Sequence, residues 1–239
     1  MKRALVTGGS GDIGSAICRR LAADGIHVIV HANSNQARAE EIVAEIKAAG
    51  GSAESTQFNV VDGAAAEQAL QQLLEAGPIQ ILVNNAGIHA DAPLAGMTRD
   101  QWSQVINVSL NGFFNVTQPL LMPMMRTRWG RIISLSSIAG VMGNRGQANY
   151  AAAKSGLHGA SRSLAIELAS RGVTVNVVAP GIIEGAMSQQ SFDNERIEEI
   201  VPMKRAGQPD EVASLVSFLA SDKSGYISAQ VISINGAMC

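Results

Sequence analysis

The sequence predicts an α/β fold: a doubly wound, parallel β-sheet of about seven strands with helices on both faces. Short runs rich in β-branched residues alternate with longer helical patterns along the chain, and this alternation is typical of parallel strands joined by right-handed crossovers. The strand runs are continuously apolar, as expected where helices cover both faces of a sheet. No linker-like tract or internal repeat interrupts the 239 residues, so we predict a single domain over 1–239.

The first half of the chain contains four predicted strands and three helices. Glycines close the helical patterns, as is common at helix C-termini. The expected strands cover residues 4–7, 27–32, 53–60 and 79–87. The expected helices cover residues 14–25, 36–51 and 64–77.

The second half continues the pattern with three strands, at 130–137, 173–181 and 229–236, and three helices, at 98–125, 148–172 and 209–221. We expect Pro119 and Pro123 to kink the first of these helices or to end it early, because proline has no N–H to donate. The stretch 182–208 is polar and irregular. An insertion at the carboxyl edge of a sheet suits a substrate lid.

Composition argues against several classes of protein. The net charge is −2 and only 4% of residues are aromatic, so we expect no nucleic-acid partner. No apolar run reaches the length of a membrane span, and Cys18 and Cys239 are too far apart in the sequence to suggest a disulfide framework or a zinc site. We therefore expect a cytoplasmic protein with no membrane association and no bound metal.

A glycine-rich stretch, "TGGSGDIG" at 7–14, joins the first strand to the first helix. Glycines at this point allow a tight turn and a close approach of the backbone to a pyrophosphate, which the helix N-terminus favours. The alternative is a plain tight turn, but the position after the first strand favours a dinucleotide site.

The end of the second strand bears on the choice of cofactor. An acidic residue there would bind the 2′-hydroxyl of NAD, and "VHANSNQAR" contains none. His31, Asn33, Ser34 and Arg38 can instead donate hydrogen bonds to a 2′-phosphate, which favours NADP(H). The alternative is a solvated polar loop.

Tyr150 and Lys154 stand four residues apart in "NYAAAKSGLHG", among very small residues. At helical spacing the phenol and the ammonium share one face. A free tyrosine has a pKa of about 10, and a neighbouring ammonium is expected to lower it towards the working pH. The alternative is an ordinary surface pair.

An ordered set of motifs resembles the short-chain dehydrogenase/reductase family. It consists of "TGGSGDIG" (7–14), "NNAG" (84–87), "SS" (136–137), "YAAAK" (150–154) and "PG" (180–181). The resemblance covers the whole chain and implies a Rossmann-type NAD(P)-binding fold. The second half is most similar to 3-oxoacyl-acyl-carrier-protein reductases, which reduce a β-keto thioester with NADPH.

The resemblance assigns roles to individual residues. Tyr150 would be the acid, Lys154 would tune it and hold the nicotinamide ribose, Ser137 would bind the substrate carbonyl, and Ser109 would take the place of a family asparagine that holds a water for proton resupply. It also implies a set of cofactor-binding residues: Gly8, Ser10, Asp12, Ile13, Gly14, Asn33, Ser34, Asn59, Val60, Asn84, Ala86, Gly87, Tyr150, Lys154, Pro180, Gly181 and Ile183.

Four positions depart from the family pattern. Asp12 stands where the family has a loop glycine, and Asn59 stands where it has an aspartate that contacts adenine. Ser109 replaces the water-holding asparagine, and Gly185 replaces a threonine that meets the cofactor. The departures leave Ser137, Tyr150 and Lys154 intact and bear on turnover rate and cofactor affinity. They suggest a specialised branch of the group.

The resemblance also implies a partner and an assembly. Arg128 and Arg171 match the two arginines that dock acyl carrier protein, an acidic partner that a basic patch would attract; the alternative is a solvated basic face. Helices 98–125 and 148–172 match those that build tetramers in the family, although they could simply pack on their own sheet. We therefore expect a homotetramer.

The expected function is NADPH-dependent reduction of a 3-oxoacyl thioester on acyl carrier protein to the (3R)-3-hydroxyacyl thioester, in fatty-acid or related polyketide or polyene synthesis. One rival is a short-chain dehydrogenase acting on another small alcohol or ketone. The other is a non-catalytic NADP(H)-binding subunit.

Overall fold

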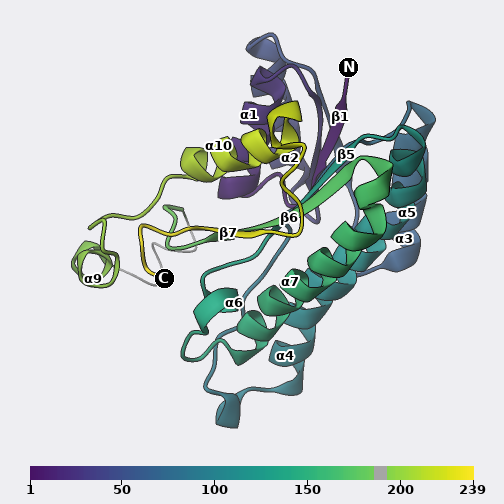
Figure 1. The fold of residues 1–239 in the computed structure, drawn as a ribbon. Coiled ribbons are helices and arrows are strands. Elements are labelled where there is room, and N and C mark those ends of the chain that lie inside the picture. The colour runs from purple at the N-terminus through teal and green to yellow at the C-terminus, as the bar shows by residue number, and fades with distance from the viewer. Residues whose placement is uncertain (186–192) are drawn as a thin grey trace.

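The computed structural model describes residues 1–185 and 193–239 and contains one seven-stranded sheet (Figure 1). Every strand pair is parallel, and the strand order is β3-β2-β1-β4-β5-β6-β7. The strands are β1 (Arg3–Val6), β2 (His27–Ala32), β3 (Ala53–Gln57), β4 (Ile81–Asn84), β5 (Gly130–Leu135), β6 (Val173–Pro180) and β7 (Val231–Ile234). The predicted α/β class and doubly wound topology are confirmed.

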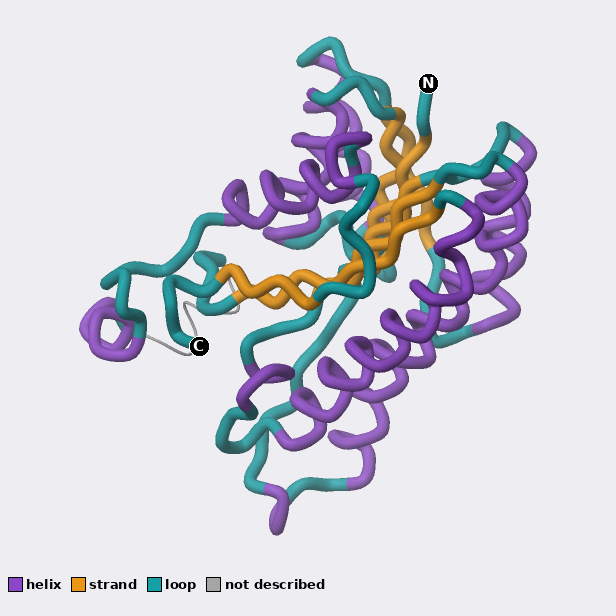
Figure 2. Tube along the Cα trace, viewed as in Figure 1, coloured by secondary structure: helices purple, strands orange, loops and turns teal. Residues whose placement is uncertain are grey.

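Helices cover both faces of the sheet, whose strands run through the centre of the molecule as a twisted band (Figure 2). One face carries α1 (Asp12–Ala23), α2 (Gln36–Ala48) and α10 (Pro209–Ala220). The other carries α3 (Gly63–Glu75), α5 (Gly112–Arg126) and α7 (Ala148–Leu168), with α4 (Arg99–Ile106) packed against α7. Short helical turns occur at α6 (Ala139–Met142), η1 (Leu94–Gly96), η3 (Ala169–Arg171) and η4 (Asp222–Ser224).

Successive residues of a strand pack into two different hydrophobic cores, one on each face of the sheet. In β1, Ala4 and Val6 pack in the core beneath α1 and α10, whereas Leu5 packs in the core beneath α3 and α5. Ile29 and Leu82 follow Leu5 into that second core. Alternation of side chains along a strand buries both faces, which explains the continuously apolar strand sequences.

The single long helix expected over 98–125 is wrong in detail. A π-helical turn, η2 (Asn107–Asn111), separates α4 from α5. Pro119 and Pro123 lie inside α5, which continues to Arg126, so the prolines do not end the helix early. Such π-helical turns are frequent at functional sites.

The stretch expected to be irregular, 182–208, contains the helix α9 (Asn194–Ile200). The Asp193 carboxylate accepts a hydrogen bond from the N–H of Arg196 and caps this helix. A parallel bridge between Ile183 and Gly207 anchors both ends of the stretch beside β6. Residues 186–192 of the expected lid lie outside the described residues.

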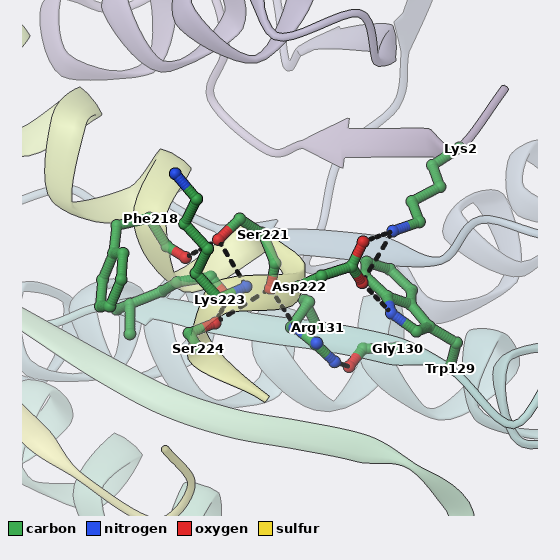
Figure 3. Close-up of polar contacts among 10 residues, drawn as sticks. Lys2, Trp129, Gly130, Arg131, Phe218, Ser221, Asp222, Lys223 and Ser224 are labelled. Carbon is green, nitrogen blue, oxygen red and sulfur yellow. Dashed lines mark hydrogen bonds and ion pairs between the residues drawn. The ribbon is translucent and has the colours of Figure 1, made fainter. Parts of the chain in front are cut away.

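A polar cluster joins three elements at the amino edge of the sheet (Figure 3). The Lys2 ammonium lies 3.6 Å from the centroid of the Trp129 ring, and the Arg131 guanidinium lies 4.3 Å from it. Trp129 Nε1 donates to Asp222 Oδ1 at 2.7 Å, and Lys2 Nζ contacts the same carboxylate at 3.1 Å. The cluster therefore connects the segments before β1 and β5 to η4.

Candidate active site

A cavity of about 780 Å³ opens at the carboxyl edge of the sheet. Its walls come from the loops that follow β1, β2, β4, β5 and β6, together with the start of α7. In a doubly wound sheet this edge is where nucleotides bind, near the point where the strand order reverses. Here the reversal lies between β1 and β4.

The glycine loop fits a dinucleotide. Gly8 has a φ of +62°, and a Cβ there would lie 3.1 Å from the Ala86 Cα. A Cβ on Gly14 would collide with the Gly8 carbonyl and lie 2.8 Å from Asn85 Nδ2. The backbone is thus packed too closely for side chains, and the N-terminus of α1 faces the cavity with its favourable dipole. These residues would hold the pyrophosphate.

At the end of β2, two of the four expected phosphate donors are engaged elsewhere. Both ring nitrogens of His31 are hydrogen-bonded within the protein, and the Arg38 guanidinium bonds to Glu41 at 2.8 Å and lies outside the cavity wall. Asn33 and Ser34 do line the cavity, together with Asn35. His31 also lines the cavity, but with both ring nitrogens engaged, the expectation that it would donate to a phosphate is wrong. Donation by Arg38 stays a prediction.

Ser137, Tyr150 and Lys154 meet in the same cavity. Ser137 follows β5, while Tyr150 and Lys154 stand one turn apart near the start of α7. Lys154 Nζ lies 5.6 Å from the centroid of the Tyr150 ring and donates to the Leu135 carbonyl at 2.8 Å. Gly87 lies so close that a Cβ there would be 3.1 Å from Lys154 Nζ.

Asn149 holds the start of α7 in place. Its side-chain amide donates to the carbonyls of Ala90 and Gln101 at 2.9 and 2.8 Å, and its Oδ1 accepts from the Tyr150 N–H at 2.8 Å. The fully buried Asn149 therefore ties the start of α7 to the loop after β4 and to α4.

Burial changes the acidity of both catalytic candidates. It raises the pKa of the Tyr150 phenol; interaction with the Ser137 hydroxyl opposes the rise and the Asp91 carboxylate adds to it. Burial lowers the pKa of Lys154 to about 8. The direction is opposite to the expectation that Lys154 lowers the Tyr150 pKa, because the loss of solvation is the largest cause of the shift.

Most of the expected cofactor residues line the cavity, and two site residues do not. Gly8, Ser10, Asp12, Ile13, Gly14, Asn33, Ser34, Asn59, Val60, Ala86, Gly87, Tyr150, Lys154, Pro180, Gly181 and Ile183 all line it. Asn84 instead donates to Thr117 Oγ1 at 3.1 Å inside the protein, and its neighbour Asn85 takes the place on the wall. Ser109 is buried in η2 and lines a separate cavity of about 10 Å³.

The outer part of the cavity carries polar residues that sequence reasoning missed. His89 lies 3.3 Å from Asp91, and Gln147 donates to the same carboxylate at 2.8 Å. Asn144 and Arg196 also line this part of the wall. His89 and Asp91 follow the last residue of "NNAG", Gly87, by two and four positions, so their place in the loop after β4 was the available signal.

Arg128 and Arg171 lie far from this cavity. Both are exposed at the amino edge of the sheet, since Arg128 precedes β5 and Arg171 precedes β6. Arg128 Nη2 donates to the Ser170 carbonyl at 3.3 Å, which brings the two arginine segments together.

Residues 1–185 and 193–239 contain no group of three or more His, Cys, Asp or Glu side chains that could hold a metal ion. None of the helices in these ranges is long and apolar enough to cross a membrane.

A doubly wound sheet, a glycine-rich nucleotide cradle and a Ser-Tyr-Lys cluster together define a nucleotide-dependent oxidoreductase. The family model for short chain dehydrogenases matches residues 2–196, and the chain belongs to that family.

Three relatives match nearly the whole chain, and each is named 3-oxoacyl-[acyl-carrier-protein] reductase FabG. The protein from Salmonella typhimurium is 46% identical over 240 residues, covering 99% of this chain and 97% of the relative. That from Staphylococcus epidermidis is 44% identical over 240 residues, covering 99% and 98%. That from Aggregatibacter actinomycetemcomitans is 40% identical over 237 residues, covering 98% of each chain.

Proposed function

We propose that this protein is an NADPH-dependent 3-oxoacyl-acyl-carrier-protein reductase, which makes the (3R)-3-hydroxyacyl thioester in fatty-acid or related polyketide or polyene synthesis. The observation that carries the proposal is the meeting of Ser137, Tyr150 and Lys154 in a nucleotide-sized cavity. The names of relatives that are 40–46% identical over nearly the full length support the choice of substrate.

NADPH, when bound, supplies a hydride for the β-carbon of the thioester. Ser137 donates a hydrogen bond to the carbonyl oxygen and stabilises the negative charge that grows there. Tyr150 gives its phenolic proton to the same oxygen, and because burial raises its pKa the proton is present at neutral pH. The Lys154 ammonium, 5.6 Å from the ring, stabilises the resulting phenolate.

The preference for NADP(H) follows from the residues near the end of β2. Asn33, Ser34 and Asn35 line the cavity there, and no described acidic residue from that loop does. A 2′-phosphate therefore meets amide and hydroxyl donors with no carboxylate to repel it.

Acyl carrier protein docks at Arg128 and Arg171. These residues lie beyond the far end of α7 from Tyr150, and a 21-residue helix is roughly 30 Å long at its usual rise. A homotetramer is supported by Phe114, Met122 and Ile166, which leave apolar surface exposed on α5 and α7 for subunit contacts.

Residues 1–239 act as one nucleotide-binding domain, and 182–208 act as the substrate lid, in a cytoplasmic enzyme. The lid assignment is supported by Arg196 and Ile200 of α9, which line the outer cavity.

The test is NADPH oxidation with an acetoacetyl thioester on carrier protein and on a pantetheine mimic. Tyr150→Phe should lower turnover at least about a hundredfold while NADPH still binds. Arg128→Glu combined with Arg171→Glu should raise KM for the carrier substrate and leave the mimic unaffected. Turnover of neither substrate by the wild type, with NADPH bound, would overturn the assignment and favour another small ketone or a non-catalytic NADP(H)-binding subunit.

A further inference from the structure

His31 lies inside the nucleotide-binding half of the protein, at the end of β2, and is only 1% exposed. Its Nδ1 accepts a hydrogen bond from the Gly8 N–H at 3.0 Å. Its Nε2 lies 2.9 Å from the Phe58 carbonyl oxygen, and its ring packs on the Phe58 ring with centroids 4.2 Å apart. The imidazole thus joins the glycine loop to the segment after β3.

These two partners fix the protonation state of the ring. A backbone N–H can only donate and a carbonyl can only accept, so Nδ1 must lack a proton and Nε2 must carry one. Only the neutral Nε2–H tautomer satisfies both partners. Burial, which lowers the pKa of His31 to about 4, agrees with a neutral ring.

Both partners of His31 lead directly to the cofactor cavity. Gly8 begins the glycine loop in a left-handed conformation, and its carbonyl accepts from the Gly11 N–H and from Asn85 Nδ2, each at 3.1 Å. Phe58 immediately precedes Asn59 and Val60, which line the cavity. The His31 ring therefore sets the distance between the glycine loop, which would hold the pyrophosphate, and the segment that contains Asn59.

We propose that His31 is a positioning residue for the dinucleotide: its neutral imidazole holds the Gly8 loop and the Phe58–Val60 segment in the arrangement that binds NADP(H), without itself contacting the 2′-phosphate. The proposal rests on the NADP(H) binding of the proposed function. It replaces the direct phosphate contact that the sequence suggested for this residue.

The first measurement is NADPH affinity from the change in nicotinamide fluorescence, together with KM and kcat. His31→Phe keeps a ring but loses both hydrogen bonds, and we expect its Kd and KM for NADPH to rise about tenfold, with kcat at saturating NADPH changed by less than about threefold. His31→Gln keeps one acceptor and one donor and should recover part of the affinity.

His27 provides a matched control. It lies at the other end of β2 and bonds to Ser52 and Glu54, away from the cavity. His27→Phe should therefore leave NADPH affinity unchanged even if it lowers stability. Equal losses of affinity in His27→Phe and His31→Phe would overturn the proposal, because they would report a general effect of changing β2.

A second measurement reads the ring of the wild-type protein directly. Nitrogen NMR of the histidine-labelled wild type should show one ring with the Nε2–H tautomer at neutral pH, assigned through His31→Gln. A protonated Nδ1 at His31, or unchanged NADPH affinity in His31→Phe, overturns the proposal. If the wild-type protein binds NADPH but reduces no 3-oxoacyl thioester, the proposed function is wrong, whereas the proposed role of His31 is unaffected.

Discussion

The Asp12 carboxylate lies against the α-carbon of Gly185, in the space that a side chain at position 185 would occupy. A Cβ on Gly185 would stand 3.0 Å from Asp12 Cγ and 3.2 Å from its Cβ, and Gly185 itself has a φ of +155°. Asp12 belongs to the first turn of α1 and Gly185 to the segment after β6, so the contact crosses the cofactor cavity. Both positions depart from the family pattern, and the geometry makes them one coupled pair.

Gly185→Thr should weaken NADPH binding, since the new side chain meets Asp12 and the backbone conformation disfavours it. We expect a loss of about 1–3 kcal/mol from the combined strain and overpacking. Asp12→Gly should relieve part of this loss, so that the double variant binds NADPH more tightly than the sum of the single effects predicts. A double-mutant cycle on the NADPH dissociation constant checks this, and strictly additive effects would show that the two positions are independent.

Turnover should fall at alkaline pH because the Lys154 ammonium is required. Its pKa is lowered to about 8 by burial, so the protonated form predominates below that pH and is lost as the pH rises through it. The pH profile of kcat/KM, which reports the free enzyme, should show an alkaline limb near pH 8, and Lys154→Arg should shift the limb upwards because arginine stays charged. Ser137→Ala serves as the control, since it should lower the rate without moving the limb.

Acid should destabilise the fold partly through His31. Its pKa falls from 6.5 to about 4 on burial, so between these values the unfolded chain binds a proton that the folded chain does not. The contribution to stability is present in full above about pH 6.5 and is lost as the pH falls towards 4, at most about 3 kcal/mol. Urea unfolding of wild type and His31→Gln across this range measures it; parallel pH dependences in the two proteins would contradict the assignment.

In the polar cluster at the amino edge of the sheet, Trp129 should contribute more to the free energy of unfolding than the ion pair between Lys2 and Asp222 does. The Asp222 side chain is 75% exposed, so Asp222→Asn should change the free energy of unfolding by less than about 1 kcal/mol. Trp129→Ala removes a ring that contacts both Lys2 and Arg131, and we expect a loss of about 2–3 kcal/mol. Chemical denaturation measures both, and turnover of the pantetheine mimic should be unchanged in each.

The sequence was sufficient where a single physical rule decided the outcome. Apolar strand runs such as 27–32 predicted the buried sheet, and the glycines of 7–14 predicted a backbone too close-packed for side chains. The spacing of Tyr150 and Lys154 likewise predicted one shared helical face.

The sequence alone did not predict features that depend on burial and on contacts between distant segments. His31 reads as a polar group near a phosphate, but only the fold shows Gly8 and Phe58 on its two nitrogens. The pKa of Tyr150 depends on the solvent it loses, which a four-residue motif does not contain. The π-helical turn that withdraws Ser109 from the cavity leaves no sign in the residues that form it.

The strand order β3-β2-β1-β4-β5-β6-β7 has a consequence for how the chain folds. The neighbouring strands β1 and β4 pair Ala4 with Ile81, and the site needs Gly8, Tyr150 and Gly181 together. Pairings this distant along the chain make folding slow, and no early fragment can assemble the cavity. The full cavity includes Gly181, which follows β6, so NADPH bound in it stabilises the completed sheet by mass action against unfolding.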